Sequence, residues 1–213
     1  MKKLEKISVI IPIRTKGSAK LAIEALRQVD YPQELIEVFL VEGNQPARQR
    51  NEAAKEAQGD IVYFLDDDSK VEKDLFLKII EIYENDKSII AVGGPMLMEE
   101  SSQAFWPKVF KNIFSSFFGV LGKRARYHPV GSLRQASEDE IILCNFSIKR
   151  EIFIKENGFN EQLYPNEENE LFGRLRKNNF KILYAPQAKV YRLSKASLID
   201  FLKSIFNYGK GRA

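Results

Sequence analysis

The amino-acid sequence predicts an α/β fold: a three-layer α/β/α sandwich around a mostly parallel central sheet. The first observation behind this prediction is order, because short apolar runs alternate with amphipathic, helix-like stretches through the first half of the chain. Such a β-α-β-α order is typical of a sheet with helices on both faces. The second observation is that the apolar runs are continuous rather than alternating, which indicates strands buried on both faces, as in a parallel sheet.

Short apolar runs rich in Ile, Val and Phe predict the strands of the first half of the chain. Two further apolar segments, "IILCNF" and "KILYAP", predict strands in the second half, whereas the aromatic and basic stretch 101–135 shows no clear strand. The predicted strands cover residues 7–13, 36–41, 61–65, 88–92, 141–146 and 181–186.

Helices are predicted where apolar side chains recur at helical spacing and a suitable residue precedes them. Ser18 and Asn166 are candidate N-caps, and Pro46 stands where proline favours a helix start. Ser69 with Glu72 resembles a capping box, in which two side chains bond reciprocally to backbone N–H groups. The predicted helices cover residues 18–29, 47–57, 72–84, 149–157, 167–178 and 197–208.

Composition and charge define a general class of protein. Of the 213 residues, 44% are hydrophobic and 29% charged, so the chain can fill an ordinary core, and we assign residues 1–213 to one domain. The one cysteine, Cys144, excludes an internal disulfide, and the one histidine, His128, excludes a histidine-rich metal site. The net charge of +4 suits a phosphate-bearing partner or an anionic membrane surface, and the sequence has no nucleic-acid-binding motif.

The sequence predicts no membrane-spanning helix, because no apolar run approaches the ~20 residues that such a helix needs. The basic N-terminus is followed by a short apolar run that proline interrupts, so we interpret it as a first strand rather than a signal peptide. A single cysteine fits a reducing compartment. We therefore expect a cytoplasmic protein, which can also lie at the inner face of the membrane.

Three consecutive aspartates, Asp66, Asp67 and Asp68, directly follow the apolar run 61–65. Ligands of α/β sheets bind beyond the carboxyl ends of the strands, so these carboxylates are expected at the ligand-binding edge. In an extended segment Asp66 and Asp68 point the same way, and such a pair can bind Mg²⁺ or Mn²⁺. A solvated acidic turn before a helix, favoured by about 0.3–1 kcal/mol, is the alternative. The residues alone leave both interpretations open.

Other polar residues are predicted at the same edge of the sheet. Glu42 follows the second predicted strand and can accept hydrogen bonds from a base or a ribose, while Arg14 follows the first strand and can face phosphates. Arg50 and Asn51 lie on the predicted helix that leads into the aspartates. Taken singly, each of these residues is explained better as a solvated surface residue.

A second acidic cluster opens the predicted helix 167–178. Glu167, Glu168 and Glu170 occupy its first turn, where carboxylates interact favourably with the helix dipole. From these residues alone, helix stabilisation explains the cluster better than a catalytic role.

Together, these motifs resemble the family 2 glycosyltransferases of the A-type, nucleotide-diphospho-sugar-binding fold. The resemblance rests on Pro12 at the end of the first strand, Glu42 after the second, and "RQRN" at 48–51. It continues through "GDIVYFLDDD" at 59–68 and the long segment 144–186, so it covers most of the chain. The order and spacing of these motifs are far more specific than a lone Asp-x-Asp pair.

Three motifs depart from the family pattern. The family's "GGF" is "NGF" at 157–159, its "ED-x-D-L" is "EENEL" at 167–171, and its "DDGS" is "EGNQ" at 42–45. The extra methylene of Glu168 moves a carboxylate by roughly one bond length, which matters for a base that must reach the acceptor within ~3 Å.

The resemblance implies an inverting glycosyltransferase that moves a sugar from a nucleotide-diphospho-sugar to a hydroxyl of a polysaccharide, a glycan or a lipid-linked carrier. It implies that Asp66 and Asp68 hold Mn²⁺ or Mg²⁺, which offsets the charge of the departing diphosphate. Glu168 is the implied catalytic base, and Glu167 helps to orient the site. The implied nucleotide-sugar-binding residues are Pro12, Arg14, Glu42, Arg50, Asn51 and Asp67.

The resemblance further assigns donor binding to residues 1–96 and acceptor binding to residues 97–213. Within the second half, residues 105–126 combine Trp and Phe at helical spacing with basic residues, a pattern that favours a membrane surface. We expect peripheral membrane contact through this segment and the C-terminus. Core packing of the aromatic side chains, with a solvated basic rim, is the alternative.

Two other functions remain as alternatives. A sugar nucleotidyltransferase usually has a Gly-rich, basic loop after its first strand, and "PIRTKGSAK" has only one glycine. The second alternative is a non-catalytic, glycosyltransferase-like binding module. Such a module does not need acidic residues at both clusters, so their presence argues against it, but the departure of "EENE" from the family pattern keeps this alternative open.

Overall fold

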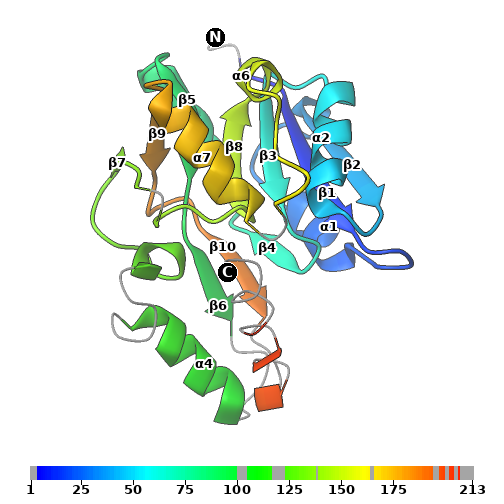
Figure 1. Ribbon diagram of the computed structural model, residues 1–213, viewed down its shortest axis with the longest axis vertical. Helices are drawn as coiled ribbons and strands as arrows, with labels where there is room; N and C mark the ends of the chain where they lie inside the picture. The colour runs from blue at the N-terminus through cyan, green and yellow to red at the C-terminus, as the bar shows by residue number, and fades with distance from the viewer. Residues whose placement is uncertain are drawn as a thin grey trace.

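The computed structural model of the chain describes residues 4–99, 105–116, 123–137, 139–163, 166–193, 197–199, 202–203 and 206. At its centre is a seven-stranded sheet in the order β2-β1-β3-β8-β5-β9-β7 (Figure 1). Its strands are β1 (Ile7–Ile13), β2 (Ile36–Glu42), β3 (Ile61–Leu65), β5 (Ile89–Gly93), β7 (Arg134–Gln135), β8 (Asn145–Lys149) and β9 (Lys181–Tyr184).

The central sheet is mixed but largely parallel. Strand β1 pairs in parallel with both β2 and β3, and β5 pairs in parallel with β9. Strand β8 is antiparallel to its two neighbours, β3 and β5, and the short β7 is antiparallel to β9. The carboxyl ends of β1, β2 and β3 therefore meet at one edge of the sheet, as the sequence predicts.

Helices cover both faces of the sheet, which confirms the predicted three-layer α/β/α arrangement. One apolar cluster packs α1 (Lys20–Leu26) and α3 (Leu75–Asn85) against one face. The other packs α2 (Pro46–Glu56), α6 (Arg150–Lys155) and α7 (Glu167–Lys177) against the opposite face. Successive residues of β1 enter different clusters, Val9 and Ile11 the first and Ile10 the second, which explains why the strand is apolar throughout.

A second, three-stranded sheet in the order β4-β10-β6 extends from the central sheet (Figure 1). It consists of β4 (Ser69–Val71), β6 (Met96–Glu99) and β10 (Val190–Leu193). Strand β10 pairs with β4 in antiparallel and with β6 in parallel orientation, and Arg192 lies opposite Ser69. This small sheet is absent from the sequence prediction, and it places the end of the chain's last described strand beside the three aspartates.

The remaining described elements are α4 (Phe105–Ser115) and two 3-10 helices, η1 (Gln33–Leu35) and η2 (Lys123–Arg126). Helix α4 lies at the far end of the small sheet, beyond β6 (Figure 1). Half of the predicted helix 197–208 lies outside the described residues. Within the described part of the chain, no helix has both the length and the apolar character needed to cross a membrane.

Several predicted element boundaries differ from the structure; the predicted helix 18–29, for example, is Lys20–Leu26. Two further differences have a clear local cause. The strand predicted at 141–146 begins at Asn145, because a turn precedes it, with the Asn145 N–H donating to the Ile142 carbonyl. It then continues to Lys149, which pairs with Ile61 of β3. The capping box of Ser69 and Glu72 does not form, because Ser69 belongs to β4, and α3 begins at Leu75.

Of the two predicted N-cap residues, Asn166 is in the predicted position and Ser18 is not. Helix α1 begins after Ala19, and the Ser18 hydroxyl accepts a hydrogen bond from the Lys20 N–H at 3.3 Å without being the cap residue. Asn166 does precede α7, but its side chain makes no capping bond; its Oδ1 accepts a hydrogen bond from Asn169 Nδ2 at 2.6 Å instead.

Candidate active site

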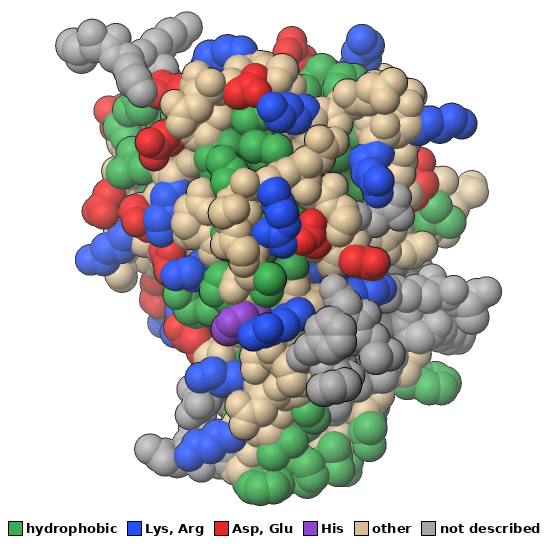
Figure 2. All heavy atoms as spheres, turned by 90° about the vertical axis from the view of Figure 1, so that its left-hand side faces the viewer, with side chains coloured by type: hydrophobic (Ala, Val, Ile, Leu, Met, Phe, Trp, Pro, Cys, Tyr) green, Lys and Arg blue, Asp and Glu red, His purple; other side chains and the backbone are tan. Residues whose placement is uncertain are grey.

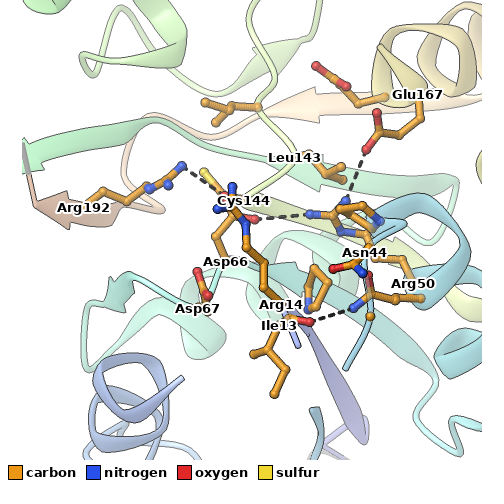
Figure 3. A pocket seen from close by; sticks show the side chains of 16 residues that line it. Ile13, Arg14, Asn44, Arg50, Asp66, Asp67, Leu143, Cys144, Glu167 and Arg192 are labelled. Carbon is orange, nitrogen blue, oxygen red and sulfur yellow. Dashed lines mark hydrogen bonds and ion pairs between the residues drawn. The ribbon is translucent and has the colours of Figure 1, made fainter. Parts of the chain in front are cut away.

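A pocket of about 590 Å³ opens at the carboxyl ends of β1 and β3 (Figure 3). Its walls come from segments far apart in the sequence: the ends of β1 and β3, the loop after β2, helix α2, the turn before β8, the start of α7, and β10. The predicted site residues that line it are Pro12, Arg14, Arg50, Asp66, Asp67, Glu167 and Glu168. Both acidic clusters of the sequence therefore face one cavity.

Arg50 connects the two acidic clusters. It lies on α2, its side chain is only 6% exposed, and its two terminal nitrogens bind different carboxylates. Nη1 donates to Glu167 Oε1 at 3.2 Å, and Nη2 donates to Asp66 Oδ1 at 3.2 Å. The start of α7 is thus joined to the end of β3 through one buried guanidinium (Figure 3).

Arg192 of β10 continues this network on the other side of Asp66. Its Nη1 donates to Asp66 Oδ2 at 3.0 Å, and its Nη2 donates to Asp68 Oδ2 at 2.7 Å. Burial opposes the charge of Arg192, but the neighbouring aspartates hold the pKa of its guanidinium well above the ordinary value. The result is a row of alternating charges, here named the charge row: Glu167, Arg50, Asp66, Arg192 and Asp68.

Three polar atoms of the charge row are buried without a hydrogen-bond partner in the described part of the chain: Arg50 Nε, Asp68 Oδ1 and Glu167 Oε2. Leaving such an atom unpaired costs about 1–3 kcal/mol. Groups of this kind need an explanation, and for Arg50 and Glu167, which line the adjoining pocket, a polar ligand provides one; Asp68 is not part of the pocket lining.

Two carboxyl groups in the pocket have raised pKa values. Burial, reinforced by the neighbouring Glu168, raises the pKa of Glu167 to about 7, although Arg50 opposes the shift. Burial also raises the pKa of Asp67, and the negative charges of Asp68 and Asp66 add to this effect. Raised carboxyl pKa values in a cleft are typical of sites that exchange protons or bind charged ligands.

Glu168 differs from Glu167 in its contacts. It lines the same pocket, but its carboxylate makes no hydrogen bond or ion pair with any residue in the described ranges. Glu167 is instead oriented by Arg50 and almost fully buried. The two adjacent acids therefore offer one unpaired and one fixed carboxyl group.

Two predicted nucleotide-sugar-binding residues lie outside the pocket wall. Glu42 is exposed, and its Oε1 accepts a hydrogen bond from the Lys16 N–H at 2.9 Å. Asn51 is buried, and its amide bonds to both the N–H and the carbonyl of Phe159, each at 2.8 Å. Asn51 thus fixes the loop after α6 and contributes to the site through that loop.

The loop that Asn51 holds explains one departure from the family pattern. Asn157 and Gly158 both adopt positive φ, 60° and 61°. A Cβ at Gly158 would collide with the Asn51 amide oxygen, so glycine is required there for space as well as for conformation. Asn157 is tolerated because asparagine enters the left-handed region more readily than most residues.

The observed arrangement of Asp66 and Asp68 does not fit the divalent cation that the resemblance implies. Both oxygens of Asp66 bind guanidinium groups, and one guanidinium, that of Arg192, joins Asp66 to Asp68. Within the described ranges, no group of three or more acidic, histidine or cysteine side chains is placed to hold a metal ion. A cation bound by both aspartates would have to displace Arg192.

Two residues that shape the pocket were not predicted from the sequence. Arg192 carried no signal, because the strand that holds it was not predicted. Gln49 is a polar residue on the buried face of α2, and its amide nitrogen donates to the carbonyls of Ile13 and Val41, joining the ends of β1 and β2. A glutamine among the small apolar residues of that helix face was a detectable signal.

Comparison with known proteins agrees with this site and fold. Residues 8–154 match the family model described as "Glycosyl transferase family 2". The chain therefore belongs to glycosyl transferase family 2, and the resemblance inferred from its sequence is confirmed.

Similar proteins extend the comparison. The chain is 28% identical over 113 residues to the uncharacterized glycosyltransferase YfnE of Bacillus subtilis (strain 168), a match that covers 53% of this chain and 26% of that protein. The crystal structure of S. aureus TarS 1-349 superposes with a TM-score of 0.62 at 15% identity, covering 88% of this chain and 60% of that one. TarS 1-349 has also been solved in complex with UDP-GlcNAc, at a TM-score of 0.60 and 16% identity, covering 90% of this chain and 59% of that one.

The mannosyltransferase PcManGT of Pyrobaculum calidifontis, solved with GDP-Man and Mn²⁺, superposes with a TM-score of 0.58 at 17% identity, covering 89% of this chain and 57% of that one. At these identities the structural likeness concerns the fold, which is of the glycosyltransferase A type. The chain spans about a quarter of the curated relative it matches and about 60% of these solved chains.

Proposed function

We propose that this chain transfers a sugar from a nucleotide-diphospho-sugar to an acceptor hydroxyl, with inversion at the anomeric carbon. The observation that carries the proposal is the charge row, which joins the aspartates after β3 to the glutamates that open α7 around one pocket. Membership of family 2 supports the reaction class. Two similar folds have been solved with UDP-GlcNAc and with GDP-Man, which supports a nucleotide-sugar donor.

The donor is proposed to lie at the end of the pocket formed by β1 and β3. Arg14, which follows β1 directly and is exposed, can reach phosphate oxygens. Asp67 faces the pocket between its two paired neighbours and is placed to accept hydrogen bonds from ribose or sugar hydroxyls. Pro12 and Arg50 also line the pocket, whereas Glu42 and Asn51 lie outside its wall and hold neighbouring backbone segments.

The reaction must stabilise the negative charge of the leaving diphosphate and remove the proton of the acceptor hydroxyl. The bond between the anomeric carbon and the diphosphate oxygen breaks, and its electron pair leaves on the diphosphate. A bond forms between the anomeric carbon and the acceptor oxygen, whose proton passes to a carboxylate base. We assign the base to Glu168, because its carboxylate faces the pocket and has no hydrogen-bond or ion-pair partner among the described residues. We assign to Glu167, which Arg50 holds, the role of orienting this part of the site.

The end of the molecule that carries α4 has surface features that suit an acceptor attached to a membrane. Helix α4 exposes Phe105 (70%) and Trp106 (36%) while it buries Phe110, and Lys108 and Lys111 are exposed on the same helix. Figure 2 shows hydrophobic side chains gathered at the lower end of the molecule, the end that α4 occupies in Figure 1. We propose that this end contacts anionic lipid at the inner face of the membrane, consistent with a lipid-linked or polymeric acceptor.

Donor binding provides the first test. UDP-GlcNAc, GDP-mannose and the matching nucleoside monophosphates are titrated into the protein by isothermal calorimetry. The proposal predicts that at least one nucleotide-diphospho-sugar binds more tightly than its nucleoside monophosphate, because the diphosphate faces Arg14 and the charge row. A protein that binds none of a broad donor panel, while a melting curve shows it folded, contradicts the proposal.

A further inference from the structure

We propose that Arg192 is the resident cation of the donor-diphosphate site, so that this chain binds a nucleoside diphosphate without a divalent metal ion. The inference rests on the proposed function, since it names the group that meets the diphosphate in the same pocket. Arg192 lines that pocket together with Arg14, Asp66 and Asp67. Figure 3 shows its side chain directed toward Asp66.

The backbone of Arg192 is fixed on both sides. Strand β10 is the middle strand of the small sheet, and Arg192 lies opposite Ser69 of β4 and beside Met98 of β6. Ser69 immediately follows the three aspartates, so the sheet pairing itself brings the guanidinium to them. Arg14, by comparison, is an exposed residue that follows a strand end. Of the two, Arg192 is the pre-organised cation.

The guanidinium occupies the position that a shared metal ion would need. Its two terminal nitrogens bind the Oδ2 atoms of Asp66 and Asp68, at 3.0 and 2.7 Å, and so bridge the Asp-x-Asp pair. The remaining oxygen of Asp66 is bound by Arg50. Asp68 Oδ1 is left as the one buried oxygen of the pair without a partner in the described part of the chain.

Arg192 also retains hydrogen-bonding capacity for a ligand. A guanidinium carries five N–H donors in a planar fork that suits phosphate oxygens. The bonds to Asp66 and Asp68 use one donor on each terminal nitrogen. The donors that remain can bind the diphosphate, while the two aspartates keep the guanidinium in place.

The chemical consequence concerns the three adjacent aspartates. Without a cation, Asp66, Asp67 and Asp68 would repel an incoming diphosphate. Arg192, with Arg50 on the other side of Asp66, offsets this charge from within the protein. The guanidinium stays protonated during the reaction, so it can interact with the growing negative charge of the leaving diphosphate without losing a proton.

The test measures binding of UDP and GDP by isothermal calorimetry, once with EDTA and once with Mn²⁺. The variants are Arg192→Gln, which removes the charge, and Arg192→Lys, which keeps the charge but cannot bridge both aspartates. Arg27→Gln is the control, because Arg27 is an exposed residue at the end of α1, outside the pocket. Circular dichroism melting confirms that each variant is folded.

The inference predicts that the wild type and Arg27→Gln bind the better of the two diphosphates about equally well with EDTA and with Mn²⁺. Arg192→Gln is expected to lose roughly tenfold to hundredfold in affinity with EDTA, the effect of losing a charged hydrogen bond. It should recover affinity with Mn²⁺, because Asp66 and Asp68 are then free to bind the ion. Arg192→Lys should lie between the two.

The possible negative results distinguish the role of Arg192 from the proposed function. Wild-type binding that disappears with EDTA and returns with Mn²⁺ overturns the role of Arg192 but leaves the proposed function standing. Undiminished binding by Arg192→Gln in EDTA also overturns it. Absence of diphosphate binding by the wild type in both buffers overturns the proposed function and this inference together.

Discussion

Glu167 should make the stability of the protein depend on pH. Its side chain is 3% exposed, one carboxylate oxygen binds Arg50 at 3.2 Å, and the other is buried without a partner in the described part of the chain. Burial is the main reason that its pKa rises from 4.5 to about 7. Folding therefore favours the protonated acid. The stability that this provides is complete below pH 4.5 and is lost as the pH rises through 7.

The magnitude follows from the two pKa values. With about 1.4 kcal/mol for each unit between 4.5 and about 7, the free energy of unfolding falls by ~3 kcal/mol over this range. For a chain of this size, 1 kcal/mol corresponds to roughly 2–4 °C in melting temperature. Glu167 alone should therefore lower the Tm by about 6–12 °C between pH 4.5 and 8.

The substitution Glu167→Gln removes the titrating group and keeps its size. We expect its Tm to exceed that of the wild type increasingly as the pH rises from 4.5 to 8, as measured by differential scanning calorimetry. Glu170→Gln is the matched control, because Glu170 lies in the same helical turn but is more exposed and paired with Arg174. A constant Tm difference between Glu167→Gln and the wild type at every pH would refute the reasoning.

Three further predictions concern the loop after α6 and helix α4. Asn51→Ala leaves the N–H and carbonyl of Phe159 unpaired and should lower the free energy of unfolding by about 2–3 kcal/mol in a urea titration; a loss below ~0.5 kcal/mol would contradict this. Asn157→Ala should cost about 1 kcal/mol at its positive φ, while Asn157→Gly should not, and equal unfolding midpoints for the two would refute the assigned conformation. Vesicles with anionic lipid should co-sediment the protein at low salt better than neutral vesicles do, and a double Phe105→Ser, Trp106→Ser variant should lose this binding. Equal binding to both kinds of vesicle would contradict the proposed contact of α4 with anionic lipid.

The central sheet was predictable because its strands are locally distinctive. Strands β1 and β3 have the predicted bounds, since continuous apolar runs between polar neighbours mark strands buried on both faces. The small sheet was not predictable in the same way. Strand β4 lies within a segment that favours a helix start by its Ser69 and Glu72, and only pairing with β10, more than 100 residues later, makes it a strand.

The site was predictable in part for a similar reason. The three aspartates were identified because they directly follow a strand whose carboxyl end lies at the ligand-binding edge of an α/β sheet. The glutamates of α7 were identified as site residues only through the resemblance to the family 2 glycosyltransferases. The contacts that join them were not predictable, because Arg50 and Glu167 are 117 residues apart and Asp66 and Arg192 are 126 apart. No local pattern shows which arginine will meet which carboxylate, so the occupation of the Asp-x-Asp pair by Arg192 appears only in the structure.

The most direct test of the proposed reaction is the rate of sugar transfer by Glu168→Gln, measured with the donor that binds best and with donor affinity determined in parallel. Glutamine keeps the size of the side chain and removes its basicity. The account predicts unchanged donor affinity and a transfer rate lower by ~10²–10⁴-fold, the usual contribution of a general base. Near-normal transfer by Glu168→Gln would contradict the assignment. In that case a loss confined to Glu167→Gln would move the base to its neighbour, and full activity of both variants would leave the acidic cluster with a structural role only.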